Sequence, residues 1–177
     1  MAVHKLIIAG FGGQGVMLIG QMIAYAGMLE GKEVTWMPSY GPEMRGGTAN
    51  CSVIVSDKRI SSPIVTDATA AVVMNLPSLT KFEGLVVPGG KLFINTSLIK
   101  ENATRDDVEI YRIDANEIAL NRLHNEQVSN MVMLGAIIDK TGVVKRESIE
   151  TVMEKLFTGK KAKLLPLNKE ALTAWKA

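Results

Sequence analysis

The chain has 177 residues, of which 47% are hydrophobic and 21% charged, so it is long and apolar enough to bury one sizeable core. Its net charge of +2 lacks the strong basic field of a nucleic-acid-binding surface. No apolar run approaches the ~20 residues of a membrane-spanning helix, and the first residues lack a signal peptide's apolar stretch. We therefore expect one domain over residues 1–177, in the cytoplasm, with neither nucleic acid nor a membrane as partner.

Residues for metal binding and catalysis are scarce. Cys51 is the only cysteine, which excludes an internal disulfide and a four-cysteine iron–sulfur cage. The two histidines, His4 and His124, stand in no metal-ligand spacing and beside no partner for nucleophilic catalysis. No Walker sequence follows the first glycines. We expect this chain to hold no metal and to contribute no catalytic residue.

A glycine-dense turn follows the first apolar run, Leu6–Ile8, and organises the rest of the chain. This glycine turn consists of Gly10, Gly12, Gly13, Gln14 and Gly15, and its glycines include the spacing G-x-G-x-x-G. Glycine permits positive φ and lets a ligand approach main-chain N–H groups closely. A helix that starts there adds unpaired donors, which suit a phosphate or another anion. The alternative is a tight turn that any parallel-sheet domain needs, whatever it binds.

Apolar residues repeat at helical spacing over about 15–30 and predict a helix there. Gly20 and Gly27 lie inside it at a cost of about 1 kcal/mol each, so we expect the sheet or another chain to pack close to them. Glu33–Met37 predicts a second parallel strand, and a Rossmann site requires an acidic residue near the end of that strand. The strand runs into Pro38 without a carboxylate, which disfavours an adenine dinucleotide.

The next segment, Pro38–Asn50, contains two prolines and three glycines, so we expect neither a helix nor a central strand. It should share the carboxyl edge of the sheet with the glycine turn, the edge where ligands bind in open α/β sheets. Tyr40, Glu43 and Arg45 are costly choices for a passive linker, and an arginine suits a carboxylate or phosphate in a bidentate pair. The alternative is a structural Glu43–Arg45 pair that holds the loop in shape.

Alternation predicts a strand at Thr48–Ser56, with Cys51 on its apolar face as a buried, inert thiol. An edge strand is expected at Ile60–Val65. Gly135 predicts close helix packing, and Trp175 is expected to dock on the surface. The other expected elements are strands at 70–74, 91–95 and 107–113, a turn at 88–90, and helices at about 77–83, 115–123, 130–140 and 149–156.

Five blocks of sequence, in order, resemble the gamma subunit of 2-oxoacid:ferredoxin oxidoreductases. They are GFGGQGV (Gly10–Val16), PSYGPEMRGGTANC (Pro38–Cys51), NLPSLTKFE (Asn75–Glu83), PGGKLFINTSLI (Pro88–Ile99) and NMVMLGA (Asn130–Ala136). The resemblance spans residues 4 to about 140, and Arg45–Cys51 is similar to the 2-oxoglutarate branch, with the branched-chain branch left open. One departure is Ile113–Ala115, where many relatives have a proline before the alanine, which puts only that local turn in doubt.

The resemblance implies a share in an enzyme of several chains. That enzyme converts a 2-oxoacid and coenzyme A to acyl-CoA and CO2, with electrons passed to ferredoxin. Thiamine diphosphate is then expected on alpha and beta subunits, and iron–sulfur clusters on beta and a ferredoxin-like delta subunit. The implied fold is a single Rossmann-like three-layer α/β domain, with a mostly parallel sheet and helices on both faces. In this family the gamma domain packs on the catalytic subunits and is implicated in the coenzyme A end of the site.

The expected cofactor-binding set is the glycine turn together with Tyr40, Glu43 and Arg45. We expect the N–H groups of Gly12–Gly15 to face an anion, such as a coenzyme A phosphate, or a partner chain. The three loop residues would shape the neighbouring loop or meet the catalytic subunits. Assembly is predicted from the glycine- and methionine-rich helices. The alternative is an independent Rossmann-type nucleotide-binding protein or reductase.

Arg45→Ala in the assembled enzyme is expected to raise the apparent KM for coenzyme A much more than the KM for the 2-oxoacid. The reason is the loss of a bidentate cation from the loop beside the glycine turn. Steady-state kinetics with each substrate varied in turn measure the two constants. An unchanged coenzyme A dependence in an intact complex would remove Arg45 from the ligand site.

Overall fold

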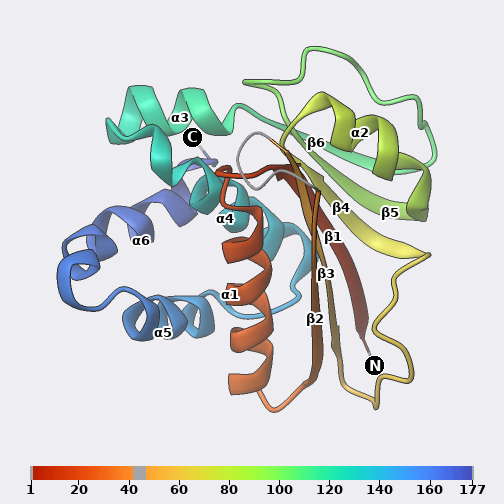
Figure 1. The fold of residues 1–177 in the computed structure, drawn as a ribbon, viewed down its shortest axis with the longest axis horizontal. Helices are drawn as coiled ribbons and strands as arrows, with labels where there is room; N and C mark the ends of the chain where they lie inside the picture. The colour runs from red at the N-terminus through yellow and green to blue at the C-terminus, as the bar shows by residue number, and fades with distance from the viewer. Residues whose placement is uncertain (1, 42–46, 177) are drawn as a thin grey trace.

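The computed structural model of the protein describes residues 2–41 and 47–176. A six-stranded sheet forms its centre, with helices on both faces (Figure 1). The strands are β1 (Val3–Phe11), β2 (Glu33–Tyr40), β3 (Thr48–Ser56), β4 (Ala68–Val73), β5 (Val86–Asn95) and β6 (Glu109–Ile113). The helices are α1 (Val16–Leu29), α2 (Leu76–Phe82), α3 (Ala115–Leu123), α4 (Ser129–Thr141), α5 (Arg146–Leu156) and α6 (Leu165–Ala174), with 3-10 turns η1 (Glu83–Leu85), η2 (Glu126–Val128) and η3 (Gly159–Leu164). Within the described ranges, no helix combines the length and apolarity needed to cross a membrane.

The strand order across the sheet is β2-β3-β1-β4-β5-β6. β1, β4, β5 and β6 pair in parallel, whereas β3 is antiparallel to both β1 and β2. The expected α/β fold with a mostly parallel sheet is therefore confirmed. The expected second parallel strand is β2, which runs in the same direction as β1. It does not pair with β1, because β3 lies between them, and it forms the edge of the sheet.

Helix α1 packs unusually close to the sheet. Its N-cap is Gly15, with φ of 77°. A Cβ at Gly20 would lie 2.4 Å from Cys51 Sγ, and a Cβ at Gly27 would lie 2.9 Å from Val34 Cγ2. Side chains at these two positions would push the helix off β2 and β3. The sheet of this chain, rather than another chain, therefore accounts for both glycines.

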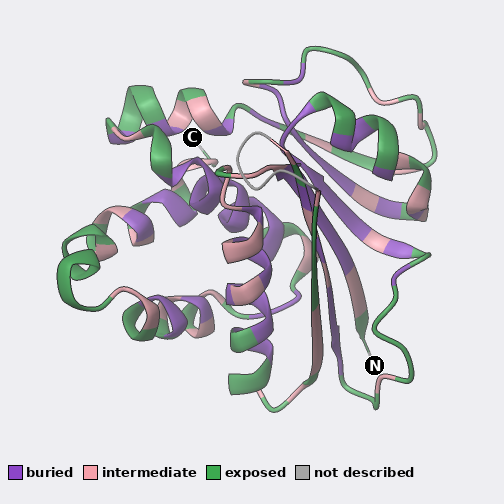
Figure 2. Cartoon of the chain, viewed as in Figure 1, coloured by how far each residue is buried: buried purple, intermediate pink, exposed green. Residues whose placement is uncertain are grey.

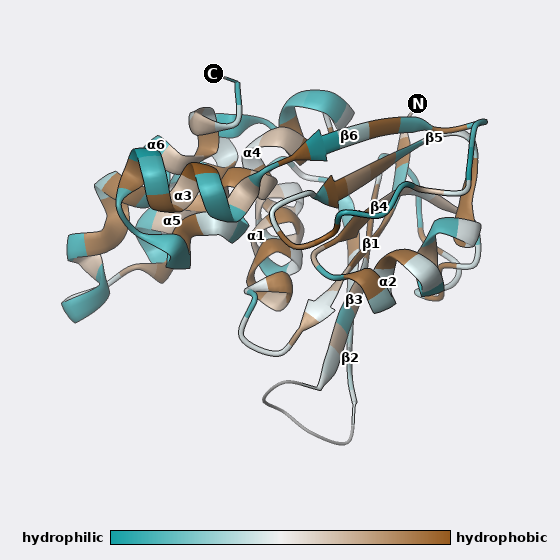
Figure 3. Ribbon diagram, turned by 90° about the horizontal axis from the view of Figure 1, so that it is seen from above, coloured by the Kyte–Doolittle hydropathy of each residue, from teal (hydrophilic) through white to brown (hydrophobic). Residues whose placement is uncertain are grey.

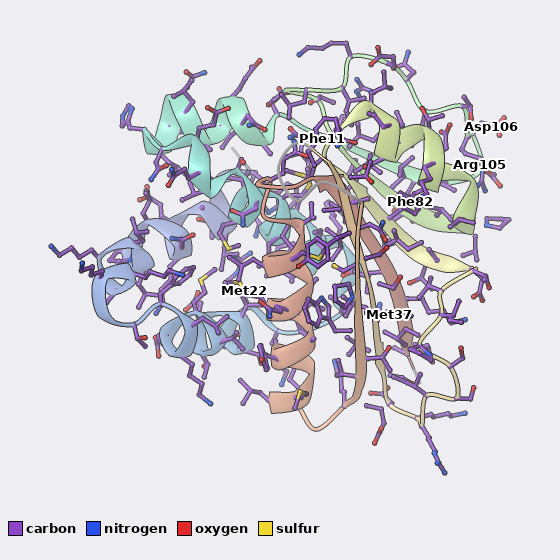
Figure 4. The ribbon with its side chains drawn as sticks, in the orientation of Figure 1. Phe11, Met22, Met37, Phe82, Arg105 and Asp106 are labelled. Carbon is purple, nitrogen blue, oxygen red and sulfur yellow. The ribbon has the colours of Figure 1, made fainter. Side chains whose placement is uncertain are left out.

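The core is divided by the sheet into a large and a small part (Figure 2). On the large side, α1, α4, α5 and α6 bury Met22, Met131 and Met133 completely. On the other side, α2 and segment 57–67 cover β1 and β3, and Phe82 of α2 lies across the sheet from Met22 (Figure 4). Figure 3 shows apolar strands at the centre and polar outer faces on α3 and α6. Because these glycines and methionines serve the chain's own core, they no longer support the prediction of assembly.

Two segments differ from the expected elements at the edges of the sheet. Ile60–Val65 forms no strand, and its two end residues instead cover the small part of the core. Pro38–Tyr40, expected to be irregular, extends β2 and pairs with β3. A proline is tolerated there because an edge strand leaves one side of its backbone outside the ladder.

The turn expected at Pro88–Gly90 lies instead inside β5. The pairing of β4 with β5 jumps from Ala68↔Val86 to Ala70↔Lys91, so the proline and glycines form an irregularity within one strand. Glycine in a strand often marks such a bulge rather than the end of the strand. The local composition therefore correctly indicated an irregularity at Pro88–Gly90, but this irregularity is a bulge within β5 and not a turn between elements.

The C-terminal helix α6, which the sequence analysis did not predict, docks on α4. A Cβ at Gly135 would lie only 1.9 Å from the backbone oxygen of Leu172 in α6, which confirms close helix packing. Trp175 Nε1 donates a hydrogen bond of 3.1 Å to Asp139 Oδ2. Arg146 and Lys176 also pair with the Asp139 carboxylate, at 2.6 and 2.9 Å. The tail therefore packs against the helical layer, which confirms the docking expected for Trp175.

Gly135→Ala is expected to lower the free energy of unfolding by about 1–3 kcal/mol, because the added methyl group meets the α6 backbone. Urea denaturation of the full chain measures the change. Gly84→Ala is the matched control, since Gly84 is exposed and nothing lies within 4 Å of a Cβ there. Equal stability of the two variants would contradict the close contact between α4 and α6.

Candidate functional site

The carboxyl ends of β1 and β4 form the topological switch point of the sheet. From β1 the chain proceeds to β2 and β3 on one side and continues through β4, β5 and β6 on the other. Ligands of open α/β sheets bind in the crevice outside the strand ends at such a point. The glycine turn follows β1 here, and Met74 follows β4. Figure 4 places Phe11, the last residue of β1, at this end of the sheet beside the start of α1.

The side chain of Gln14 ties the glycine turn to both strands. Its Oε1 accepts a hydrogen bond of 2.6 Å from the N–H of Phe11, and its Nε2 donates to the carbonyl of Met74 at 3.2 Å. A Cβ at Gly10 would lie 2.5 Å from Gln14 Oε1, so glycine is required there to leave room for the amide. Gly13, with φ of 95°, adopts the left-handed conformation that completes the turn.

Only part of the turn offers free donors. The N–H of Gly12 donates to the carbonyl of Gly47 at 2.9 Å, and the N–H of Gln14 donates to the carbonyl of Phe11 at 3.2 Å. Gly13 and Gly15 donate to no other residue that the structure describes. The expectation that all four N–H groups face a ligand is therefore wrong for Gly12 and Gln14, and for Gly13 and Gly15 it stays a prediction. The first turn of α1, which has no side-chain cap and no acidic residue, adds its own N–H groups.

One cleft lies between the N-termini of α1 and α4, and we call it the α1/α4 cleft. Its volume is about 270 Å³. Its lining residues are Gly13, Gln14, Gly15, Met74, Asn116, Glu126, Gln127, Ser129 and Asn130. Ser129 and Asn130 are buried on its inner wall, whereas Glu126 and Gln127 are exposed at its outer end. The cleft therefore joins the glycine turn to a polar wall of α3, η2 and α4.

A second cleft, the Tyr40 cleft, lies on the opposite side of the glycine turn. It has about 370 Å³ and is lined by the turn, the first residues of α1, Tyr40 and Ala49. Tyr40 is 55% exposed. The bond from Gly12 to Gly47 joins the start of β3 to the turn, as expected for a loop at the same edge of the sheet. Glu43 and Arg45 lie outside the described residues, so their predicted roles stay predictions.

The sequence analysis missed the residues of the α3–α4 wall. Asn116 Oδ1 accepts from Asn95 Nδ2 at 2.8 Å, and Asn116 Nδ2 donates to Glu126 Oε1 at 2.9 Å. Asn130 packs against Gly15, where a Cβ would lie 2.3 Å from its Nδ2 atom. The available signal was polar residues at the start of an otherwise apolar helix, since Asn130 directly precedes Met131.

Cys51 is fully buried, and burial raises the pKa of its thiol to about 12. The expectation of an inert thiol is confirmed by this environment. Among residues 2–41 and 47–176, no group of three or more His, Cys, Asp or Glu side chains could hold a metal ion. A single buried cysteine does not fit the ligand set of an iron–sulfur cluster.

The sequence matches the family described as "Pyruvate ferredoxin/flavodoxin oxidoreductase" over residues 5–174. The chain belongs to this family. It is 36% identical over 172 residues to ketoisovalerate oxidoreductase subunit VorA of Methanothermobacter marburgensis, covering 96% of this chain and 35% of that relative. It is 35% identical over 156 residues to 2-oxoglutarate synthase subunit KorC of the same organism, covering 85% of this chain and 84% of KorC. The chain thus spans about a third of the VorA proteins that it matches.

Solved structures of the oxidoreductase family share the fold. The gamma subunit of a keto/oxoacid ferredoxin oxidoreductase from Geobacter sulfurreducens superposes with a TM-score of 0.82 at 27% identity, over 97% of this chain and 95% of that one. The 2-oxoglutarate:ferredoxin oxidoreductase from Magnetococcus marinus superposes with a TM-score of 0.90 at 22% identity, over 99% of this chain and 31% of that one. At this identity the similarity shows the fold alone. The expected resemblance to gamma subunits is confirmed.

The native chain is expected to react at least roughly 100-fold more slowly with a disulfide reagent such as DTNB than the unfolded chain does at pH 8. A thiol pKa of about 12 leaves about one thiolate in 10⁴ at that pH, and burial blocks access to it. The absorbance of the released thiolate follows the reaction. A Ser61→Cys variant, altered at an exposed position, should release one fast equivalent and leave Cys51 unreacted. Rapid release of two equivalents would contradict the buried thiol.

Proposed function

We propose that this chain is the gamma subunit, or gamma-type portion, of a 2-oxoacid:ferredoxin oxidoreductase. The supporting observation is the family match over residues 5–174, together with the similarity to subunits of enzymes named for 2-oxoglutarate and ketoisovalerate. The complete enzyme would oxidise a 2-oxoacid with coenzyme A to an acyl-CoA and CO2 and pass two electrons to ferredoxin. 2-Oxoglutarate is the proposed substrate, on the form of Arg45–Cys51.

The chemistry of bond cleavage and electron transfer is assigned to partner chains. Thiamine diphosphate and iron–sulfur clusters, bound to alpha, beta and delta subunits, would supply decarboxylation and the electron path. Among the described residues, no group of three or more His, Cys, Asp or Glu side chains could hold a metal ion, and the thiol of Cys51 is buried with its pKa raised to about 12. We assign binding and placement of a ligand to this chain.

Coenzyme A is the ligand that the glycine turn is proposed to meet. The N–H groups of Gly13 and Gly15, which donate to no residue within 2–41 and 47–176, and the start of α1, which has no side-chain cap, suit a phosphate oxygen. The two flanking clefts give a ligand access to the turn from either side. A phosphate held there would anchor coenzyme A while its thiol end reaches the catalytic subunits. Tyr40, with Glu43 and Arg45, would complete the rim or contact those subunits.

A free-standing dinucleotide-binding protein or reductase is the second candidate, and one structural observation weighs against it. In a Rossmann site the second strand lies next to the first and carries the acid that binds the ribose hydroxyls. Here β3 stands between β1 and β2, which moves the end of β2 one strand spacing further away, ~4.8 Å. The strand also lacks a carboxylate at that end, since it finishes with Pro38–Tyr40.

Co-expression with the products of neighbouring genes tests the proposal. The chain should co-purify with alpha- and beta-type subunits, and the complex should reduce ferredoxin only when both a 2-oxoacid and coenzyme A are present. A panel of 2-oxoglutarate, pyruvate and 3-methyl-2-oxobutanoate identifies the substrate, with 2-oxoglutarate expected to give the highest kcat/KM. If the chain does not co-purify with these subunits and binds NAD or FAD tightly by itself, the assignment is overturned in favour of the second candidate.

A further inference from the structure

Helix α1 is apolar on the face that points away from the sheet as well as on the face that packs against it. Its 14 residues, Val16–Leu29, include no charged side chain. Three large side chains on the outer face, Tyr25, Met28 and Leu29, are 46%, 62% and 49% exposed, toward the C-terminal end of the helix (Figure 2). A helix that is apolar all round is normally buried on every side. The outer face of α1 therefore indicates a surface that another element covers.

This face borders a groove between α1 and α5, which we call the α1/α5 groove. Its volume is about 340 Å³, and its lining residues are Tyr25, Met28, Leu29, Val152, Lys155 and Leu156. Val152 is buried and Leu156 is half-buried. Lys155 is the only charged residue among the described ones that line the groove. The groove thus collects the exposed large apolar side chains of α1 beside a single positive charge.

The outer face continues toward the N-terminus of α1. Leu18 and Gln21 are half-buried and line the Tyr40 cleft, at the other end of the helix. From Leu18 to Leu29 the face is about 16 Å long, since a helix rises 1.5 Å per residue. An occupant that covers it therefore needs about three helical turns of its own.

Acidic groups near the groove are turned away or already paired. At 100° per residue, the glutamates of α5 lie about 140° or more around the helix from Val152, whereas Lys155 lies about 60° from it. These glutamates are Glu147, Glu150 and Glu154. Glu30, which follows α1, pairs with Lys32 at 2.9 Å and accepts from the N–H of Lys145 at 2.6 Å. The groove is therefore left with a positive charge.

The 3-10 turn η3 extends this charge beyond the end of α5. It begins at Gly159, three residues after α5 ends, and its lysines are exposed. We call Lys155 and these lysines, Lys160, Lys161 and Lys163, the basic rim. None of the four forms an ion pair with another residue of segments 2–41 and 47–176. The basic rim therefore complements an acidic partner.

The charge and shape of this surface favour one occupant over two others. A symmetric dimer uses the same patch on both copies, so it would place two basic rims in one interface, where like charges repel. An extended strand needs an open sheet edge for its backbone hydrogen bonds, which a groove between two helices does not offer. An amphipathic helix satisfies its own backbone and inserts apolar side chains at i, i+3, i+4 and i+7 into such a groove.

We propose that the α1/α5 groove binds an acidic amphipathic helix of a partner subunit. The apolar side of that helix covers Tyr25, Met28 and Leu29, and its carboxylates face the basic rim. This inference rests on the proposed function in one respect, because it takes the partner to be a subunit of the same oxidoreductase.

Binding of a synthetic helix to the full chain is the first test. The probe is a fluorescein-labelled peptide of about 18 residues, long enough to form a helix, with leucine at i, i+3, i+4 and i+7 and glutamate on both flanks. Fluorescence anisotropy should show saturable binding. A peptide with lysine in place of every glutamate should bind roughly 10-fold or more weakly. Equal binding of the two peptides would overturn the proposal.

Two variants locate the probe on the chain. Met28→Gln removes an apolar contact and should weaken binding of the glutamate peptide roughly 5-fold or more. Lys155→Glu should weaken the glutamate peptide and strengthen the lysine peptide, because the charge of the groove is reversed. Both residues are exposed, so unfolding in urea should stay close to that of the parent chain.

Matched controls lie on other surfaces of the chain. Leu120→Gln changes a side chain of α3 that is 54% exposed, and Lys58→Glu reverses a charge in the exposed segment that follows β3. Neither should change the affinity for the probe. Losses equal to those of Met28→Gln and Lys155→Glu would overturn the assignment to the groove. A dimer of the full chain that Met28→Gln dissociates in sedimentation would assign the groove to a second copy and likewise overturn the proposal.

The assembled complex distinguishes this inference from the proposed function. A partner helix should already fill the groove there, so the probe should bind the complex roughly 10-fold or more weakly than it binds the separate chain. Met28→Gln should also lower the recovery of partner subunits in co-purification, and Leu120→Gln should not. A complex that forms and still binds the probe as tightly as the separate chain overturns the inference and keeps the function. A chain that binds the probe through Met28 and Lys155 but joins no oxidoreductase subunit overturns the function and keeps the groove as a docking site.

Discussion

The bridge made by Gln14 is the interaction on which the site depends. One amide joins the end of β1 to the residue after β4, and it leaves the carboxyl ends of the two strands in a single arrangement. Each hydrogen bond contributes a net ~0.5–1.5 kcal/mol, and loss of the amide would also leave the N–H of Phe11 and the carbonyl of Met74 without this partner. Gly10 is required by this bridge, because a Cβ there would lie 2.5 Å from Gln14 Oε1, whereas Gly13 and Gly15 are required by their positive φ.

The antiparallel strand β3 decides what kind of α/β protein this is. By entering between β1 and β2, it moves β2 to the edge of the sheet and removes the second strand from the position it has in a dinucleotide site. The same insertion brings Gly47 to the glycine turn, where its carbonyl takes the N–H of Gly12. The N–H of Gln14 also donates within the chain, to the carbonyl of Phe11, so two of the four N–H groups of Gly12–Gly15 serve the fold.

Glycines in the helical layer allow its helices to pack closely on the sheet and on one another. Gly20 and Gly27 let α1 lie against β2 and β3, and Gly135 lets α4 meet the backbone of α6. Tight packing of this kind holds the N-termini of α1 and α4 at the same crevice. The proposed role, to bind and position a ligand for chemistry on other chains, would depend on this rigidity more than on a reactive side chain.

Local patterns determined much of this protein from the sequence alone. Alternation and helical spacing predicted β3, α1 and α3 nearly to the residue, and they placed Cys51 in the core, because these properties depend on neighbours a few positions away. The quoted blocks also pointed to the family. Only the tertiary structure decided that β3 separates β1 from β2, that Pro88–Gly90 is a bulge, and that Asn130 faces Gly15. Strand order and the meeting of distant residues follow from long-range packing, which no local spacing encodes.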